Sequence, residues 1–64
     1  MKCTPREKEV LLLLKSGRTT ANIAAHLGIR ERRVMFHIDN ILRKLQVGNR
    51  LEAVVQALKR EWIS

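Results

Sequence analysis

The chain has 64 residues, 45% of them hydrophobic, and carries 13 Lys and Arg against 6 Asp and Glu, for a formal net charge of +7. This length allows one domain, residues 1–64, with a modest core, and excludes a second domain. The excess of positive charge favours a polyanionic partner, nucleic acid first and an anionic membrane second, over a merely basic domain.

A first helix is predicted over residues 5–16. Thr4 and Glu7 have the spacing of a capping box, and a proline suits the first helical position between them. Gly17 is a natural stop. The run of leucines is too wide for one buried stripe, so Leu12 either lies partly exposed or contacts something outside the domain. The residues expected inside are Val10, Leu11, Leu13 and Leu14.

The next two predicted helices, residues 20–27 with Thr19 as the N-cap and residues 31–45, have the spacing of a helix-turn-helix. Ala24 is small enough to let a second helix approach, Gly28 can end the first helix in a left-handed conformation, and Val34 would anchor the second helix. A helix that begins with arginines and is braced by a partner helix suits the DNA major groove.

Helical periodicity gives residues 31–45 an inward and an outward face. The inward arc, roughly 100° wide, is expected to form the core; it contains Val34, Ile38, Ile41, Leu42 and Leu45. The outward face is polar and cationic. Its arginines can bond guanine bidentately or clamp a phosphate, and base contacts usually come from the N-terminal part of such a helix.

We therefore predict base contacts near the start of this helix, from Arg32, Arg33, Met35 and Phe36. Phosphate contacts are predicted further along, from Asn40, Arg43 and Lys44. The remaining expected DNA-binding residues are Thr19, Thr20, Arg30 and His37.

Each of these assignments has an alternative. The arginines could form only a solvated charged face, and Phe36 could anchor into another protein or a neighbouring loop. His37 either bonds a phosphate or caps a nearby carbonyl. Asp39 either pairs with Arg43 one turn later or repels unwanted phosphate approaches.

A fourth helix is predicted to begin at a second capping box, Asn49 with Glu52, and to reach Glu61 or Trp62. It has more apolar residues than a small domain buries easily. One face would therefore pack on the core and one on the same helix of a second copy, with alanines allowing close approach. The predicted dimer contacts are Leu51, Val55, Leu58 and Trp62. Alternatively, all of them belong to the core, or Trp62 folds back onto the first helix.

A single-helix interface is small compared with the ~1,000 Å² that stable interfaces bury. We therefore predict a monomer or weak dimer in solution and a dimer on DNA.

No strand or repeat is predicted, so the expected fold is an all-α four-helix bundle. Several segments occur together along nearly the whole chain: Thr4-Pro5-Arg6-Glu7, Glu9-Val10-Leu11, Ile23-Ala24, Leu27-Gly28-Ile29, Val34, His37-Ile38, Asn40-Ile41-Leu42-Arg43-Lys44-Leu45, Val47, Asn49-Arg50 and Glu52-Ala53. With them the chain resembles the C-terminal DNA-binding domain of the LuxR-type (GerE-like) bacterial transcription regulators. The resemblance implies recognition by the third helix, a homodimer on a two-fold symmetric site, and a dimer contact through the fourth helix.

Four positions depart from that family's pattern. Arg30 stands where a serine or threonine often caps the third helix, and the poorer cap costs roughly 1 kcal/mol. Asn22 stands where a glutamate commonly completes the cap of the second helix. Arg33 and Met35 replace a usual threonine and a frequently polar or basic base-reading residue, so the family's usual site preference is not carried over.

Phe36-His37 is similar to the variant in many quorum-sensing members, which carry an N-terminal acyl-homoserine-lactone-binding domain. Response-regulator members, with a phosphoacceptor domain, share most of the other positions. We expect the chain to be the output domain excised from such a longer regulator, with a small stand-alone protein as the alternative.

The predicted function is sequence-specific binding of double-stranded DNA in the cytoplasm, with no cofactor and no enzymatic activity. Cys3 is the single cysteine, which excludes an internal disulfide and, with only His26 and His37 available, a zinc site. No apolar run approaches the ~20 residues that span a bilayer, so no membrane contact is expected. The alternative is an interaction module that pairs through the fourth helix with a related regulator and has little DNA affinity of its own.

Overall fold

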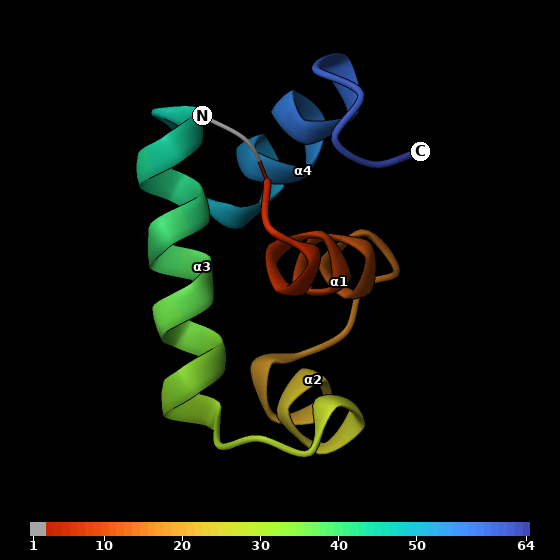
Figure 1. Cartoon of the computed structure of the whole chain (residues 1–64), viewed down its shortest axis with the longest axis vertical. Helices are drawn as coiled ribbons and strands as arrows, with labels where there is room; N and C mark the ends of the chain where they lie inside the picture. Colours follow the sequence, from red (N-terminus) through yellow and green to blue (C-terminus); the bar gives the residue numbers. More distant parts are fainter. Residues whose placement is uncertain (1–2) are drawn as a thin grey trace.

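The computed structural model describes residues 3–64, and within that range it contains four α-helices and no strand. They are α1 (Pro5–Lys15), α2 (Thr20–Leu27), α3 (Glu31–Leu45) and α4 (Arg50–Lys59). Figure 1 shows α3 running the length of the molecule, with α2, α1 and α4 arranged along one side of it. The prediction of an all-α fold with four helices is confirmed.

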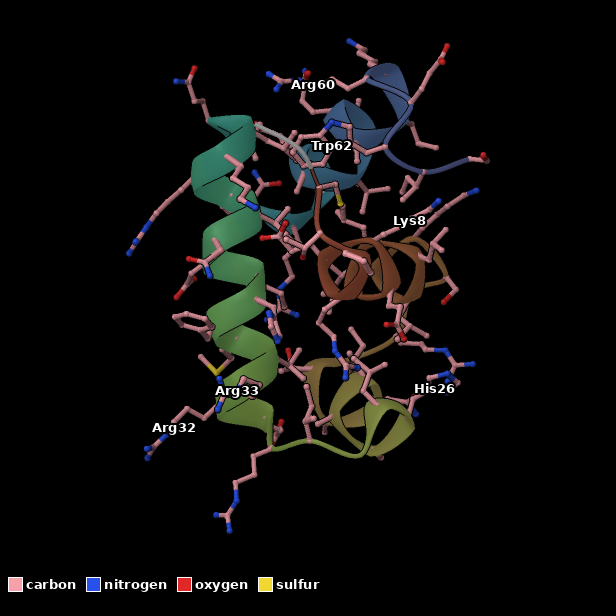
Figure 2. All side chains as sticks on the ribbon, viewed as in Figure 1. Lys8, His26, Arg32, Arg33, Arg60 and Trp62 are labelled. Atoms are coloured by element: carbon pink, nitrogen blue, oxygen red, sulfur yellow. The ribbon has the colours of Figure 1, made fainter. Side chains whose placement is uncertain are left out.

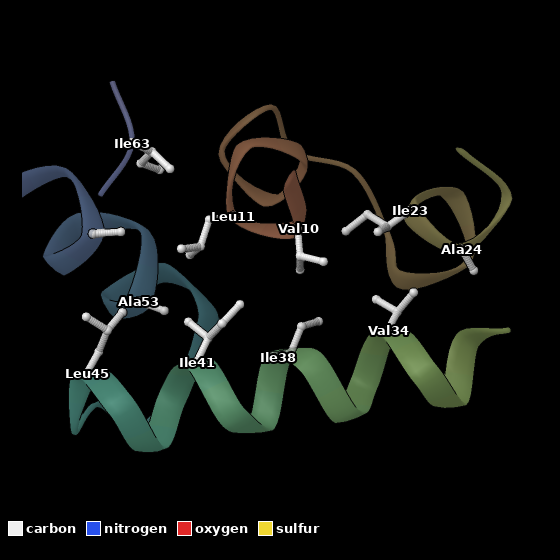
Figure 3. Close-up of a cluster of buried hydrophobic side chains, with 11 residues drawn as sticks. Val10, Leu11, Ile23, Ala24, Val34, Ile38, Ile41, Leu45, Ala53 and Ile63 are labelled. Atoms are coloured by element: carbon white, nitrogen blue, oxygen red, sulfur yellow. The ribbon is translucent and has the colours of Figure 1, made fainter. Parts of the chain in front are cut away.

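The core lies between α3 and the other three helices (Figure 3). Along α3, Val34 faces α2, Ile38 faces Val10 of α1, and Ile41 and Leu45 lie opposite α1 and α4. All four α3 side chains are buried, as the periodicity predicted, while Leu42 is partly buried at the edge. Because this row of α3 contacts α2, α1 and α4 in turn, the orientation of α3 is fixed along its whole length.

The side of α4 that packs on the core is made of alanines. Ala53 and Ala57 are buried, whereas Leu51, Val55 and Leu58 point to solvent and are 75%, 41% and 38% exposed. The prediction of two apolar faces is therefore confirmed. The placement of the alanines on the partner face was wrong, because their small side chains are what bring the α4 backbone close to α1 and α3.

The first two helices begin at the predicted side-chain caps. Thr4 Oγ1 accepts the Glu7 backbone N–H at 3.2 Å, and Glu7 Oε1 accepts the Thr4 N–H at 3.0 Å, which completes a capping box. Thr19 Oγ1 accepts the Asn22 N–H at 3.1 Å. These bonds satisfy N–H groups that have no partner inside the helix.

The caps of α3 and α4 differ from each other. Asn49 Oδ1 accepts the Glu52 N–H at 2.9 Å, but the Glu52 carboxylate accepts the N–H of Gly48 instead of that of Asn49, so the second predicted capping box is only half formed. Arg30, the N-cap of α3, makes no side-chain capping bond, as its residue type predicted.

All four helices end beside a residue with left-handed backbone angles. Two of these residues are the predicted stops Gly17 and Gly28, with φ of 83° and 69°; the others are Gln46 and Glu61, with φ of 57° and 58°. The prediction that the fourth helix reaches Glu61 or Trp62 was wrong, because nothing in the sequence marks a glutamate as a left-handed stop. The reversal turns Trp62 back toward the bundle. Its backbone N–H donates to Ala57 O at 2.8 Å, and its side chain packs, half-buried, on the core.

Gln46→Gly and Glu61→Gly are each expected to raise the free energy of unfolding. A left-handed conformation costs a residue with a Cβ about 1–2 kcal/mol, against which glycine's greater freedom in the unfolded chain leaves a net gain of up to about 1 kcal/mol. Urea denaturation of each variant measures the gain. The matched opposite is Gly28→Ala, where an added Cβ would meet nothing within 4 Å, so that only backbone strain changes. Equal stability of all three variants and the wild type would contradict the assignment.

Candidate nucleic-acid interface

The helix-turn-helix is formed by α2, the turn at Gly28 and α3. The turn is closed by the Ile29 N–H, which donates to Ala24 O at 3.0 Å. Buried Ala24 and buried Val34 lie on the packed sides of the two helices, as their spacing predicted (Figure 3). α2 braces the start of α3, and α1 and α4 pack on the same side further along. The opposite face of α3 is therefore left open over its whole length.

The open face of α3 carries most of the predicted DNA-binding side chains. Arg32, Arg33 and Arg43 are exposed, and Met35 and Phe36 are each 54% exposed. Figure 2 shows Arg32 at the lower end of α3, pointing away from the other helices. Leu12, the exposed leucine of α1, does not lie on this face. The exposed arginines and the exposed apolar side chains that are predicted to contact DNA therefore share one face of α3.

A hollow of about 540 Å³ lies at the start of α3. It is lined by Ile29, Arg30, Arg32, Arg33 and Phe36. Helix N-termini favour anions because their first N–H groups lack helical partners and the helix dipole is positive there. With no side chain bonded to these N–H groups at the Arg30 cap, the hollow combines a positive helix end, guanidinium groups and an aromatic ring.

His37 lies at the edge of the open face, half-buried, with its ring edge-on to Phe36 at a centroid distance of 5.9 Å. Burial lowers the pKa of His37, and the positive charges of Arg6 and Arg33 lower it further, against an opposing effect of Glu7. Within residues 3–64 the His37 ring donates to no carbonyl, so its predicted alternative as a carbonyl cap is not realised. Burial and the neighbouring positive charges thus both disfavour the protonated imidazole, and an arriving anion would act in the opposite direction.

Lys44 is turned inward. Its Nζ lies 2.7 Å from Glu7 Oε1, and its side chain is only 20% exposed. Lys44 is predicted to hold a phosphate, and in this structure its ammonium pairs with the buried carboxylate of Glu7 on α1. Asp39 is exposed and forms no ion pair with Arg43, although both belong to the described part of the chain.

The two flanks of the α3 open face differ in character. The flank toward α4 borders a groove of about 520 Å³, lined by Met35, Ile38, Asp39, Leu42, Gly48, Asn49, Arg50 and Leu51. This groove is mainly apolar, and its charged side chains are one acid, Asp39, and one base, Arg50. The opposite flank, toward the start of α1, carries Arg33, half-buried Asn40 and half-buried His37, and the positive charge of Arg6 on α1 acts on His37. Positive charge is thus displaced toward α1.

Arg6 was not among the predicted contacts. The packing of α1 on α3 brings it near His37, which lies 31 positions later, so no local pattern in the sequence could have indicated the pair.

The predicted dimer contacts are split. Leu51, Val55 and Leu58 share the outer face of α4, while Trp62 lies beyond the end of that helix and packs on the core. Thr19 caps α2 and Thr20 begins it, so both lie at the start of the helix that supports α3.

Residues 3–64 contain neither a metal-binding group nor a membrane-spanning helix. No group of three or more His, Cys, Asp or Glu side chains there is placed to hold a metal ion. None of the helices has the length and apolarity needed to cross a membrane. Figure 2 shows His26 on the side of α2 away from α3, remote from the open face.

Comparison with known proteins identifies the family. The family described as GerE, bacterial regulatory proteins of the luxR family, matches residues 1–57. The transcriptional activator protein CarR of Pectobacterium carotovorum subsp. carotovorum is 50% identical over 56 residues, which are 88% of this chain and 23% of CarR. The spore germination protein GerE of Bacillus subtilis (strain 168) is 46% identical over 56 residues, 88% of this chain and 76% of GerE.

Solved structures agree. The structure of GerE superposes with a TM-score of 0.91 at 36% identity, covering 95% of this chain and 91% of that one. The response regulator ChrA of a heme-sensing two-component system gives a TM-score of 0.95 at 35% identity, covering 98% of this chain and 31% of ChrA. The chain spans less than a third of CarR and of ChrA. These relatives are regulatory proteins and not enzymes. The chain belongs to the luxR family of bacterial regulatory proteins, whose helix-turn-helix domain serves DNA-binding transcription regulation.

Proposed function

We propose that this domain binds double-stranded DNA sequence-specifically with α3 in the major groove, as the output domain of a bacterial transcription regulator. The observation that carries the proposal is the division of α3 into a buried apolar row and an open face with Arg32, Arg33 and Arg43. Helix-turn-helix proteins usually recognise the major groove with a rigidly held helix whose guanidinium groups point outward.

The position of each side chain along α3 supports a division of roles. Arg32, Arg33, Met35 and Phe36 lie in its first two turns, where base edges are usually read; the arginines suit guanine, and the two apolar side chains suit a thymine methyl group. Further along, Arg43 and Asn40 would hold phosphates. At the start of α2 and α3, phosphate contacts are proposed for Thr19, Thr20 and Arg30.

The salt dependence of binding to a labelled random-sequence duplex tests the proposal. If a dimer neutralises about eight phosphates, log affinity falls against log salt concentration with a slope near −7. A selection from a random duplex library should then return a two-fold symmetric sequence. An affinity that is weak at low salt and unchanged at high salt would exclude DNA binding.

We further propose that two copies pair on DNA through the outer face of α4. Leu51, Val55 and Leu58 are spaced by four and three residues, so they form one exposed stripe. The stripe is narrow, which is consistent with a dimer that forms on DNA and is weak in solution. We also propose a signal-sensing domain before this one, either acyl-homoserine-lactone-binding or phosphoacceptor, in keeping with the longer relatives, and action in the cytoplasm, in keeping with DNA as the partner.

Val55→Glu is expected to abolish pairing on DNA. Two carboxylates facing each other across the two-fold axis repel and are desolvated. Analytical ultracentrifugation with a duplex that contains two selected half-sites should show one bound protomer at concentrations where the wild type binds two. Leu12→Glu places the same charge at an exposed apolar position on α1 and should leave two protomers bound. Two bound protomers of the Val55→Glu variant would rule out this face.

The same α4 stripe would serve an interaction module that pairs with a related regulator and has little DNA affinity. No binding of the wild type to duplex DNA, together with pairing that Val55→Glu removes, would favour that function.

A further inference from the structure

The first turn of α1 brings to α3 a cation that the helix-turn-helix does not account for. Arg6 is half-buried and forms no ion pair or hydrogen bond with residues 3–64. Its neighbour Glu7 is fixed on two sides, by Lys44 Nζ at 2.7 Å and by the Thr4 N–H at 3.0 Å. The backbone that carries Arg6 is therefore anchored against the C-terminal half of α3.

The flank of α3 that faces this turn is a stripe of polar side chains. Arg33, His37, Asn40 and Lys44 follow one another at spacings of four, three and four residues, so they share one side of the helix. Lys44, the last residue of the stripe, contacts Glu7 in the anchored turn of α1. From there the stripe runs back along α3, toward the start of the helix, and reaches the open face.

The charges at this place do not cancel. Besides burial, the positive charges of Arg6 on α1 and of Arg33, one helical turn before His37, both lower the pKa of His37. Glu7 is the one acidic group that acts on His37, and its carboxylate is already engaged by Lys44 and Thr4. Positive charges from two helices thus act on His37, and among residues 3–64 only the already engaged Glu7 opposes them.

We propose that Arg6 and His37, beside the base-reading Arg33, bind one backbone phosphate of DNA, so that α1 belongs to the DNA interface. This inference rests on the proposed function and adds a phosphate site to it. Guanidinium groups bond phosphate bidentately, and a phosphate beside His37 would favour the protonated imidazole. The site adjoins the open face of α3, which is where a phosphate strand bordering the major groove would pass.

Arg6→Ala compared with Lys8→Ala tests the inference. Both remove one charge from α1, but two residues in a helix lie on roughly opposite sides, and Figure 2 shows Lys8 on the side of α1 away from α3. With a labelled random-sequence 20-base-pair duplex, Arg6→Ala should weaken binding about five- to tenfold and lower the salt slope by about one for each bound protomer. Lys8→Ala should change affinity less than about twofold. Arg6→Lys, which keeps the charge but not the bidentate geometry, should have an affinity between those of the wild type and Arg6→Ala and should keep the wild-type salt slope.

NMR titration of the His37 ring gives a readout that a purely structural role of Arg6 would not move. In the free protein, Arg6→Ala should raise the pKa of His37 because a positive neighbour is lost. The duplex should raise that pKa in the wild type and less in Arg6→Ala, whereas inorganic phosphate at equal phosphate concentration should have little effect if the site needs the DNA strand.

Thermal unfolding of each variant confirms that it is folded before binding is compared. Equal affinities of Arg6→Ala and Lys8→Ala, with a duplex-induced pKa change of His37 that is the same in both, would overturn the inference while leaving DNA binding by α3 intact. Failure of the wild type to bind the duplex would instead remove the proposed function.

Discussion

Glu7→Ala is expected to lower the free energy of unfolding by about 3 kcal/mol, a large part of the roughly 3–10 kcal/mol that holds a domain of this size. Glu7 is 3% exposed, and its carboxylate accepts hydrogen bonds from Lys44 on α3 and from the Thr4 backbone. The alanine variant loses the capping bond and leaves the Lys44 ammonium without this partner. The loss should fall at the low end of the range for buried pairs because the Lys44 side chain retains 20% exposure to water.

Urea denaturation of single and double variants isolates the pair. Glu9→Ala, an exposed acid on the same helix, should cost less than about 0.5 kcal/mol. The double variant Glu7→Leu with Lys44→Met should be more stable than the sum of its two single changes predicts, because removing both charges leaves neither one buried alone. Additive losses, or a Glu7→Ala cost equal to that of Glu9→Ala, would contradict a structural role for the pair.

The Glu7–Lys44 pair should also make the free energy of unfolding depend on pH, in a direction that follows from the pKa of Glu7. Burial acts to raise the pKa of Glu7, but the hydrogen bonds from Lys44 and Thr4 and the Lys44 charge outweigh it, so the pKa lies below its ordinary value of 4.5. The ionised group therefore stabilises the fold above about pH 4.5, and this contribution is lost as the pH falls through the lowered folded-state pKa. Glu7→Gln should lack this part of the acid dependence.

Local patterns predicted most of the fold. Thr4 and Glu7, Thr19, and Gly17 and Gly28 mark helix boundaries by chemistry that acts within four residues, and the structure confirms each. The inward row of α3 followed from its period alone, because a helix with one apolar face has only one way to turn it to a core. The family resemblance that these residues carry is confirmed by the comparisons.

The remainder depends on contacts between helices. Lys44 and Arg43 look alike in the sequence, yet Glu7 on another helix draws Lys44 inward and leaves Arg43 exposed. In α4 the alanine face is the one that packs against α1 and α3, and periodicity cannot tell which of two apolar faces is buried. Which of the outward side chains touch DNA bases stays a prediction.

The triple substitution Arg32→Ala, Arg33→Ala and Arg43→Ala is expected to weaken binding to duplex DNA more than 100-fold. A guanidinium contact to a base or a charged hydrogen bond to a phosphate contributes about 1–3 kcal/mol, so three of them account for at least about 3 kcal/mol. All three side chains are exposed, and unfolding stability should change little.

The matched control removes the same number of positive charges from other surfaces. Lys8, Lys59 and Arg60 are exposed, and Figure 2 shows Lys8 and Arg60 away from the open face of α3. Their triple alanine variant lowers the net charge of the domain equally, so it reports how much binding is general attraction to a polyanion. If α3 enters the groove, this control should lose less than about tenfold in affinity and keep most of its salt slope, because its phosphate contacts remain. Equal losses in the two triple variants would mean that the domain is attracted to DNA by net charge alone, and that the open face of α3 is not its binding surface.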